Sequence, residues 1–228
     1  MSATTRVLLV GAAGRMGKAV SAAAADRNSG LTIAGGIERG GALEPALENC
    51  DVVIDFSLAD ATEEVCRACA AKGKPLVLGT TGHTTVQKAA ITAAAQQIPL
   101  VYAANFSIGV NALFALTRRA AALLGKEFDV EVVEMHHRKK KDAPSGTAKR
   151  LLEVLLSERG ADEIPAHSVR AGDIVGEHTV LFAGPGERLE LTHRAASRET
   201  FAVGALRAAR WVIGRPAALY SMEDVLGL

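Results

Sequence analysis

Aromatic residues and unbalanced charge are both scarce in this sequence. Phe, Tyr and Trp make up 4% of the 228 residues, too few for a platform on which nucleic-acid bases could stack. Lys and Arg number 26 against 25 Asp and Glu, and a formal net charge of +1 gives no electrostatic basis for binding nucleic acid or an anionic membrane. The composition therefore predicts neither a nucleic-acid partner nor a membrane partner.

Cysteine is also rare, with only Cys50, Cys66 and Cys69. An odd count without a repeated spacing is not typical of a secreted disulfide scaffold. Cys66 and Cys69 form a C-x-x-C pattern, which could be redox-active or half of a zinc site, but no second cysteine pair or nearby histidine pair supplies further ligands. We expect packing residues one turn apart on a helix over 61–72, and no bound metal.

Long apolar runs are absent as well. No stretch of about 18 apolar residues occurs, so no membrane span is expected. The first six residues lead directly into a strand-like run and lack the basic start, apolar stretch and cleavage site of a signal peptide. We therefore expect a cytoplasmic protein.

Strand-like and helix-like segments alternate through the first half of the chain. Apolar strands are predicted over residues 6–10, 31–37, 52–55, 75–78 and 100–103, and helices over 16–25, 61–72 and 85–97. Near-continuous apolar strands separated by helices are typical of a parallel sheet covered on both faces. This half therefore predicts a dinucleotide-type α/β domain.

The pattern changes near residues 106–108. Helices are predicted over 110–124, 148–157 and 199–213, with a strand over 128–135 and further strands between 168 and 193. Gly184-Pro185-Gly186 is a favourable hairpin turn between two of those strands. The predicted fold is α/β, with a Rossmann-type parallel-sheet domain followed by a smaller α+β domain.

A glycine-rich loop, Gly11-Ala12-Ala13-Gly14-Arg15-Met16-Gly17, lies between the first strand and its helix. Its glycines permit a tight turn, close approach of a pyrophosphate and close helix–strand packing, and the helix start offers N–H groups to phosphates. A plain structural turn would match the pattern too. Glu38, at the end of the second strand, favours a dinucleotide because it can accept hydrogen bonds from a ribose. Arg39, together with Arg15, could hold the 2′-phosphate of NADP, or Arg39 could be a solvated loop charge.

Small and hydroxyl residues follow three later strands. The segments are Asp55-Phe56-Ser57, Gly79-Thr80-Thr81-Gly82 and Ala103-Ala104-Asn105-Phe106-Ser107. Ligands of open parallel sheets bind beyond the carboxyl ends of the strands, so we expect these loops to line one crevice on the nicotinamide side.

The most distinctive segment is 134–147, EMHHRKKKDAPSGT, which holds two histidines and four cations within six residues. Such crowding is unfavourable unless an anion offsets it, and a dicarboxylate substrate would do so. Ser145, Gly146 and Thr147 precede a predicted helix, where N–H groups and hydroxyls can cradle a carboxylate. The alternatives are a purely structural helix cap, a histidine metal site, or a solvated basic face that could bind nucleic acid.

These motifs resemble those of the dihydrodipicolinate reductase family over nearly the whole chain. The matching segments are GAAGRMG at 11–17, DFS at 55–57, GTTG at 79–82, AANFS at 103–107, EMHHRKKKDAPSGTA at 134–148, RAGDIVGEHTV at 170–180 and THRAASRETFAVGALRAARWV at 192–212. The HHRKKKDAPSGT segment is highly specific to that family.

The resemblance implies roles for individual residues. His136 and Lys140 match the catalytic pair, Lys140 being chosen among three adjacent lysines by its spacing, and His137, Gly146 and Thr147 match substrate-carboxylate contacts, to which we add Ser145. The cofactor-binding residues would be Gly11, Ala12, Ala13, Gly14, Arg15, Met16, Glu38, Arg39, Gly79, Thr80, Thr81, Ala103, Ala104, Asn105 and Phe106.

The resemblance also implies the reaction and the assembly. It predicts NADPH- or NADH-dependent reduction of 4-hydroxy-tetrahydrodipicolinate to tetrahydrodipicolinate, with loss of water, in the diaminopimelate route to lysine. Residues 1–106 and 199–228 would bind the dinucleotide. Residues 107–198, with an open mixed β-sheet, would bind substrate and form a homotetramer. Crowded cations would lower the pKa of titratable groups in the 134–147 segment.

Two other classes of protein share some of these features. Another two-domain NAD(P)-dependent amino-acid or semialdehyde dehydrogenase would share the glycine loop and the alternating half, but it predicts no HHRKKKDAPSGT segment. A non-enzymatic dinucleotide sensor would have no reason to carry paired histidines with a lysine four residues after the first.

Overall fold

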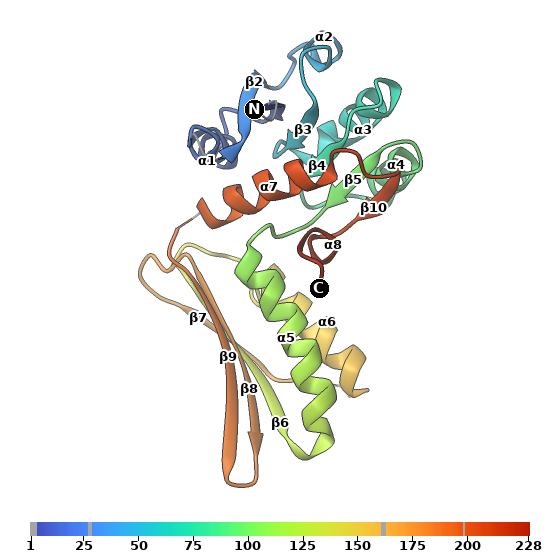
Figure 1. Cartoon of the computed structure of the whole chain (residues 1–228). Helices are drawn as coiled ribbons and strands as arrows, with labels where there is room; N and C mark the ends of the chain where they lie inside the picture. The colour runs from blue at the N-terminus through green and yellow to red at the C-terminus, as the bar shows by residue number, and fades with distance from the viewer. Residues whose placement is uncertain (1–3, 27–28, 161–162, 198) are drawn as a thin grey trace. The chain divides into compact units, whose positions relative to one another are not determined.

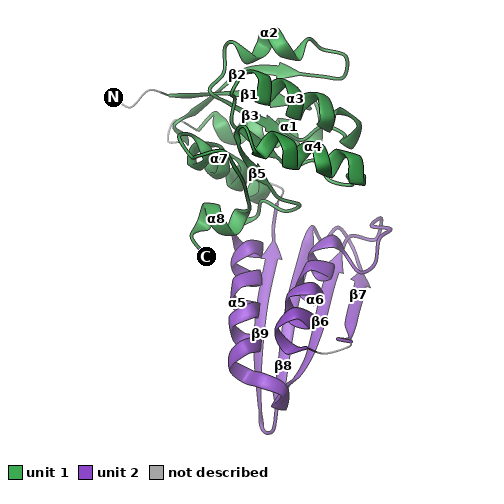
Figure 2. Ribbon diagram, turned by 90° about the vertical axis from the view of Figure 1, so that its right-hand side faces the viewer, with its two compact units in different colours: residues 1–107, 199–227 green, residues 108–198, 228 purple. Residues whose placement is uncertain are grey.

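The computed structural model describes residues 4–26, 29–160, 163–197 and 199–228. The chain divides into two compact units (Figure 2), unit 1 with residues 1–107 and 199–227 and unit 2 with residues 108–198 and 228. The expected domain boundary after residue 106 lies one residue from this division. Each unit has its own sheet and core.

Unit 1 is built on a six-stranded parallel sheet (Figure 1). Its strands, in the order β10-β5-β4-β3-β1-β2, are Ala218–Tyr220, Pro99–Tyr102, Leu76–Leu78, Val52–Asp55, Thr5–Val10 and Leu31–Ile37. The order reverses direction at β1, which defines a topological switch point where such sheets bind ligands. The Rossmann-type prediction is confirmed, although β10 was not predicted because three residues carry too little periodicity.

Helices cover both faces of this sheet. They are α1 (Arg15–Ala24), α2 (Leu43–Leu47), α3 (Thr62–Ala71), α4 (Thr85–Ala95), α7 (Glu199–Val212) and α8 (Met222–Leu226). Alternate β1 residues enter different cores: Val7 and Leu9 pack with α1 and α7, whereas Leu8 and Val10 pack with α2, α3 and α4. The short helices α2 and α8 were not predicted.

The three cysteines pack in the second of these cores. Cys50, Cys66 and Cys69 are free thiols with at most 1% exposure. Burial raises the pKa of Cys66 to about 12, with a smaller contribution from Asp55, and the thiols therefore stay protonated. The expectation that Cys66 and Cys69 are packing residues is confirmed, and Cys50 packs in the same core.

Unit 2 has a four-stranded mixed sheet in the order β7-β6-β8-β9. The strands are Ala166–Arg170, Asp129–His136, Gly176–Gly184 and Glu187–Ala195, with β6 and β7 parallel and the other pairs antiparallel. Helices α5 (Ile108–Leu124) and α6 (Gly146–Arg159) lie side by side on one face, and the described residues of unit 2 place no helix on the other face (Figure 2). The predicted open mixed sheet is confirmed.

Helix α5 with the turn that follows it, Ile108–Glu127, is long and apolar enough by length and composition to cross a membrane. As expected from the sequence, this segment holds no uninterrupted apolar run of about 18 residues. Arg118 and Arg119 lie in the middle of the helix. Val110, Leu113 and Phe114 of this helix pack in the core of unit 2. A helix buried in a protein core can have the same length and apolar composition as a membrane-spanning helix.

Helix α7 contacts a loop of unit 1 through a glycine. A Cβ atom at Gly204 would lie 1.8 Å from the carbonyl oxygen of Phe106, so only glycine lets α7 approach this backbone. The loop after β5, which holds Phe106, is therefore supported by a helix from the far end of the chain.

This close approach makes a stability prediction. Gly204→Ala should lower the free energy of unfolding by about 2 kcal/mol because the methyl group overpacks the interface, although helix propensity alone favours Ala by about 1 kcal/mol. The measurement is denaturant unfolding. Val203→Ala, at an adjacent position that is 49% exposed, is the control and should change stability by less than about 0.5 kcal/mol. A stabilised Gly204→Ala variant would contradict this packing.

Candidate active site

The glycine loop joins β1 to α1 with the geometry expected of a phosphate-binding turn. Gly11 has φ of +79°, and a Cβ atom at Gly17 would lie 2.3 Å from the carbonyl oxygen of Gly11. Gly14 caps α1 without a side-chain hydrogen bond, so the first N–H groups of the helix are not used by a cap. These N–H groups and the helix dipole fit an anionic phosphate.

Glu38 reaches back from the end of β2 to this loop. Its carboxylate accepts a hydrogen bond from the N–H of Ala13, which ties the two segments together. Beside them lies a cavity of about 560 Å³, a volume typical of small-molecule sites. Its walls include Gly11, Gly14, Glu38, Arg39 and Leu58. The cavity, the acid and the uncapped helix fit the adenosine and phosphate parts of a dinucleotide.

The three strand-end loops come together around Phe56. The Phe56 ring meets Phe106 edge-on with centroids 5.7 Å apart, and a Cβ atom at Gly79 would lie 2.1 Å from it. Each loop is also fixed locally: the Ser57 N–H donates to Asp55 at 2.7 Å, and the Ser107 N–H donates to Asn105 at 2.8 Å. The loops expected on the nicotinamide side therefore contact one another within unit 1.

In unit 2, a buried carboxylate organises the end of β6. Glu134 has no exposed surface and forms a two-point ion pair with Arg170 of β7, with N–O distances of 2.6 and 2.9 Å. Glu134 also contacts Nδ1 of His136, the next residue on the same face of the strand. Burial alone would raise the pKa of Glu134, but hydrogen bonds from Arg170, Ser168 and His136 outweigh it and lower the pKa to about 2.

His136 is 8% exposed, and burial is the largest cause that lowers its pKa. Glu134 opposes this shift, while Lys140 and Arg170 add to it. The expectation that cations lower the pKa is therefore right in direction, but burial is the main cause. A Cβ atom at Gly176 would lie 3.0 Å from Nε2 of His136, so the absence of a side chain there leaves space beside this nitrogen.

The start of α6 is tied to the same carboxylate. The Ser145 N–H donates to Glu134 at 3.3 Å, and Ser145 Oγ caps the helix by accepting from the Ala148 N–H at 3.2 Å. Ser145 Oγ also lies 3.1 Å from Nε2 of His178 on β8. His136 and Ser145 thus share one buried partner, and Gly146 and Thr147 follow in the first helical turn, where N–H groups lack intrahelical acceptors.

Lys140 differs from its two lysine neighbours. Its N–H donates to the His137 carbonyl at 3.0 Å, which closes a turn, and its side chain is 21% exposed and lies 2.9 Å from Asp142. Lys139 and Lys141 are exposed. Asp142, which lies in the same loop, thus neutralises part of the positive charge of the basic cluster. Among the described residues, His137 does not join the hydrogen-bonded group around Glu134.

Sequence reasoning assigned no role to Glu134, Arg170 or His178. An acid two residues before a strand histidine was a usable signal, because both side chains lie on one face. Arg170 and His178 could not be found in this way. Strand pairing alone sets Arg170 beside His136 and His178 opposite Glu134. Within the described residues, no group of three or more His, Cys, Asp or Glu has a metal-binding arrangement.

Unit 1 has a doubly wound sheet with a glycine loop and an acid at the end of β2, and unit 2 has a buried acid–histidine pair. These features are typical of the dinucleotide-dependent oxidoreductases. The family model described as dihydrodipicolinate reductase, N-terminus, matches residues 5–106, and the one described as its C-terminus matches residues 109–226. The chain belongs to the dihydrodipicolinate reductase family, whose members use NADH or NADPH.

Curated relatives are similar over nearly their full length. A protein of Akkermansia muciniphila named 4-hydroxy-tetrahydrodipicolinate reductase is 50% identical over 241 residues, covering 97% of this chain and 98% of the relative. Proteins of the same name from an Anaeromyxobacter species and Geobacter sulfurreducens are 46% and 42% identical, covering 97% and 98% of this chain and 97% and 99% of the relatives.

Solved structures share the fold. A dipicolinate-bound dihydrodipicolinate reductase from Paenisporosarcina sp. TG-14 has a TM-score of 0.83 at 24% identity, covering 97% of this chain and 99% of that one. A DAP dehydrogenase from C. glutamicum has a TM-score of 0.55 at 12% identity, covering 96% of this chain and 93% of that one. At these identities the likeness concerns the fold alone, so the amino-acid dehydrogenase alternative gains no support beyond architecture.

The Glu134–Arg170 pair makes a stability prediction. Arg170→Met should lower the free energy of unfolding by about 3 kcal/mol at pH 7, because it leaves a buried carboxylate without its cation. Arg194→Met is the matched control on the same sheet. It removes a pair to Glu177 in which Arg194 is 69% exposed, and should cost less than about 1 kcal/mol. Equal losses in the two variants, measured by denaturant unfolding, would contradict the central role of the buried pair.

The same pair predicts a dependence on pH. The pKa of Glu134 is lowered from 4.5 to about 2, so its contribution is fully present above pH 4.5 and is lost as the pH falls toward 2. The corresponding loss of unfolding free energy is about 3 kcal/mol. Arg170→Met should lose less over this range, as measured by denaturant unfolding at stepped pH. If Arg170→Met lost as much unfolding free energy as the wild type between pH 4.5 and 2, the ion pair would not be the cause of the pH dependence.

Proposed function

We propose that this protein reduces 4-hydroxy-tetrahydrodipicolinate to tetrahydrodipicolinate, with loss of water, using NADH or NADPH in the diaminopimelate route to lysine. The relatives at 41–50% identity carry the name of this activity. The observation that carries the proposal is the arrangement in unit 2, where one buried carboxylate holds both a histidine and the start of a helix suited to a substrate carboxylate.

Unit 1 would hold the dinucleotide. Gly11 to Met16 and the start of α1 suit its pyrophosphate, Glu38 suits the adenosine ribose, and Arg39 suits a 2′-phosphate. The loops with Gly79 to Thr81 and Ala103 to Phe106 would contact the nicotinamide side. When bound, the cofactor supplies the hydride.

Unit 2 would hold the dicarboxylate substrate. Ser145, Gly146 and Thr147 offer a hydroxyl-bearing helix start with a favourable dipole, and His137 and Lys140 offer donors from the preceding loop. Two carboxylates held at separate points fix the ring in one orientation, which makes hydride transfer effectively intramolecular. Lys140 would exchange its contact with Asp142 for one with the substrate.

His136 and Lys140 would supply the proton that follows the hydride. The contact of Nδ1 with the Glu134 carboxylate favours a proton on Nδ1, so Nε2 is the nitrogen that exchanges a proton with the substrate. Burial lowers the pKa of His136, so the ring is mostly neutral at pH 7 and needs a nearby proton source. Lys140, four residues on in the same loop, would be that source.

The open face of the unit 2 sheet would pack against further copies in a homotetramer. It carries the half-buried Val133, Met135 and Leu181 with Val169, which is 40% exposed, and no helix among the described residues of unit 2 covers it. Apolar side chains on an uncovered face are typical of an association surface. The enzyme would act in the cytoplasm on a small dicarboxylate, without nucleic-acid or membrane partners.

Variants of the basic loop test the catalytic roles. His136→Gln and Lys140→Ala should each lower kcat by at least about 100-fold, since each removes a proton-transfer group. Cofactor absorbance, with substrate generated in situ, is the measurement. Lys139→Ala and Lys141→Ala are matched controls and should stay within about threefold of the wild type. Near-normal turnover in His136→Gln or Lys140→Ala would exclude a proton-transfer role for the residue that was replaced.

Arg39 provides a test of cofactor choice. Arg39→Ala should raise KM for NADPH by about tenfold, because one charge-assisted contact to the 2′-phosphate is lost, and should leave KM for NADH within about twofold. Arg67→Ala, which removes an exposed cation paired with Glu44 outside the cavity wall, should change neither value. Equal effects on both cofactors would exclude a 2′-phosphate role for Arg39.

A further inference from the structure

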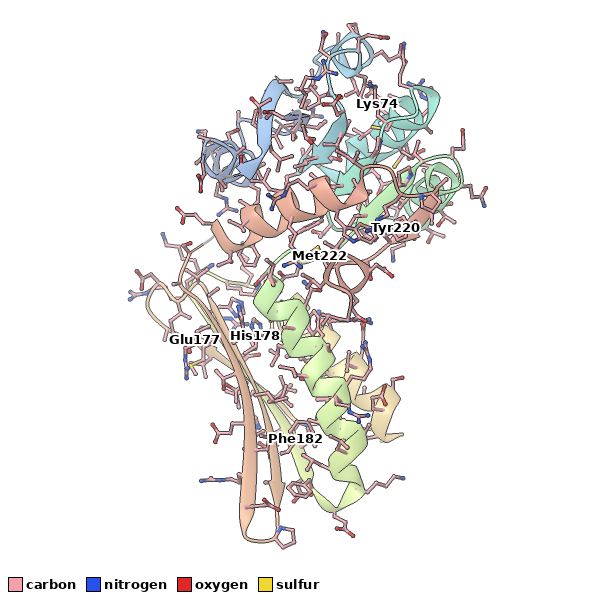
Figure 3. All side chains as sticks on the ribbon, viewed as in Figure 1. Lys74, Glu177, His178, Phe182, Tyr220 and Met222 are labelled. Carbon is pink, nitrogen blue, oxygen red and sulfur yellow. The ribbon has the colours of Figure 1, made fainter. Side chains whose placement is uncertain are left out.

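His178 occupies an unusual position in unit 2. It is 4% exposed and projects from β8 on the side that faces α5 (Figure 3). Its ring meets the ring of His136 edge-on with centroids 5.2 Å apart, and Glu134 and His193 are its cross-strand partners. Nothing in the proposed chemistry above uses this residue, although it contacts two residues that do.

The His178 ring is neutral. Burial is the largest cause that lowers its pKa, to about 4, with His136, His193 and Lys140 adding to the shift and Glu134 opposing it. A neutral imidazole has one N–H donor and one acceptor nitrogen. Nε2 lies 3.1 Å from Ser145 Oγ, whereas buried Nδ1 has no hydrogen-bond partner within the described part of the chain.

The two tautomers differ in what they leave unpaired. With the proton on Nδ1, a buried N–H donor would have no acceptor, which is rarer in proteins than an unsatisfied acceptor. With the proton on Nε2, the ring donates to Ser145 Oγ, and only an acceptor nitrogen is left unpaired. The surroundings therefore favour the Nε2–H form.

This tautomer determines what the Ser145 hydroxyl can do. A hydroxyl has one O–H and accepts two hydrogen bonds. Ser145 Oγ would accept from the Ala148 N–H at 3.2 Å and from His178, which fills both acceptor positions. The Ser145 N–H is bound to Glu134, so the hydroxyl hydrogen is the one polar group of this residue that still needs a partner among the described residues.

We propose that His178 is a positioning residue, which fills the acceptor side of Ser145 Oγ so that the Ser145 O–H is presented to a substrate carboxylate at the start of α6. The inference rests on the proposed function, since it requires a dicarboxylate ligand. Ser145 is 2% exposed, so a carboxylate in contact with it would be largely withdrawn from water, where a charge-assisted hydrogen bond is strong.

The test uses pyridine-2,6-dicarboxylate (dipicolinate) as probe, with Kd measured by titration calorimetry on the full chain. His178→Met removes the N–H and should weaken binding by about tenfold, whereas His178→Gln, of similar size, restores an amide N–H and should stay within about threefold. Ser145→Ala should also weaken binding by about tenfold. Adding His178→Met to Ser145→Ala should not raise the Kd for dipicolinate any further, because the two residues act through one hydroxyl.

Kinetics and cofactor binding separate this role from a structural one. KM for the substrate should rise in His178→Met by the same factor as Kd while kcat stays within about threefold, as expected for lost ground-state binding. NADH affinity should not change, because unit 1 holds the cofactor residues. Equal weakening by Met and Gln, or additive effects of His178→Met and Ser145→Ala, would overturn the positioning role.

A measurement on the wild-type protein covers the case in which a variant fails to fold. The ¹⁵N shifts of the His178 ring should report the Nε2–H tautomer with and without dipicolinate, and an Nδ1–H tautomer would overturn the proposal. If the wild type binds dipicolinate but the variants are unaffected, His178 is excluded and the proposed function stands. If the wild type neither binds dipicolinate nor reduces the substrate, the proposed function fails and this role fails with it.

Discussion

The carboxylate of Glu134 is buried without exposed surface, where an unpaired charge would be strongly unfavourable. Its charge is tolerable because Arg170 binds both oxygens and His136 and the Ser145 N–H supply further contacts. Each of these partners comes from a different part of unit 2: β7, the end of β6 and the start of α6. The requirement to neutralise one buried acid therefore sets the positions of the groups that we propose for proton transfer and substrate binding.

Unit 1 depends on a different constraint, which is the parallel sheet itself. Because its strands run in one direction, their carboxyl ends meet at one edge, and the loops that follow β1, β3, β4 and β5 lie there together. Phe56 then joins three of these loops, since Gly79 leaves room for its ring and Phe106 meets it edge-on. Gly204 of α7 supports the same region from the end of the chain.

Local sequence patterns predicted the features that depend on neighbouring residues. The glycine loop, the helix start after Ser145 and a strand over 128–135, which the structure places at Asp129–His136, all follow from short-range geometry. Patterns failed where an element was short, as with α2, β10 and α8. The longer helix α5, with its regular apolar spacing, was predicted.

The sequence by itself determined the family, the parallel-sheet domain and the segments that hold the candidate functional residues, because contiguous motifs specify each of these. Tertiary structure alone decided which residues surround those segments. Arg170 lies beside His136, and His178 lies opposite Glu134, only because the strand register of unit 2 brings them together. Pairing between distant strands depends on the packing of the whole sheet, so no local pattern specifies it.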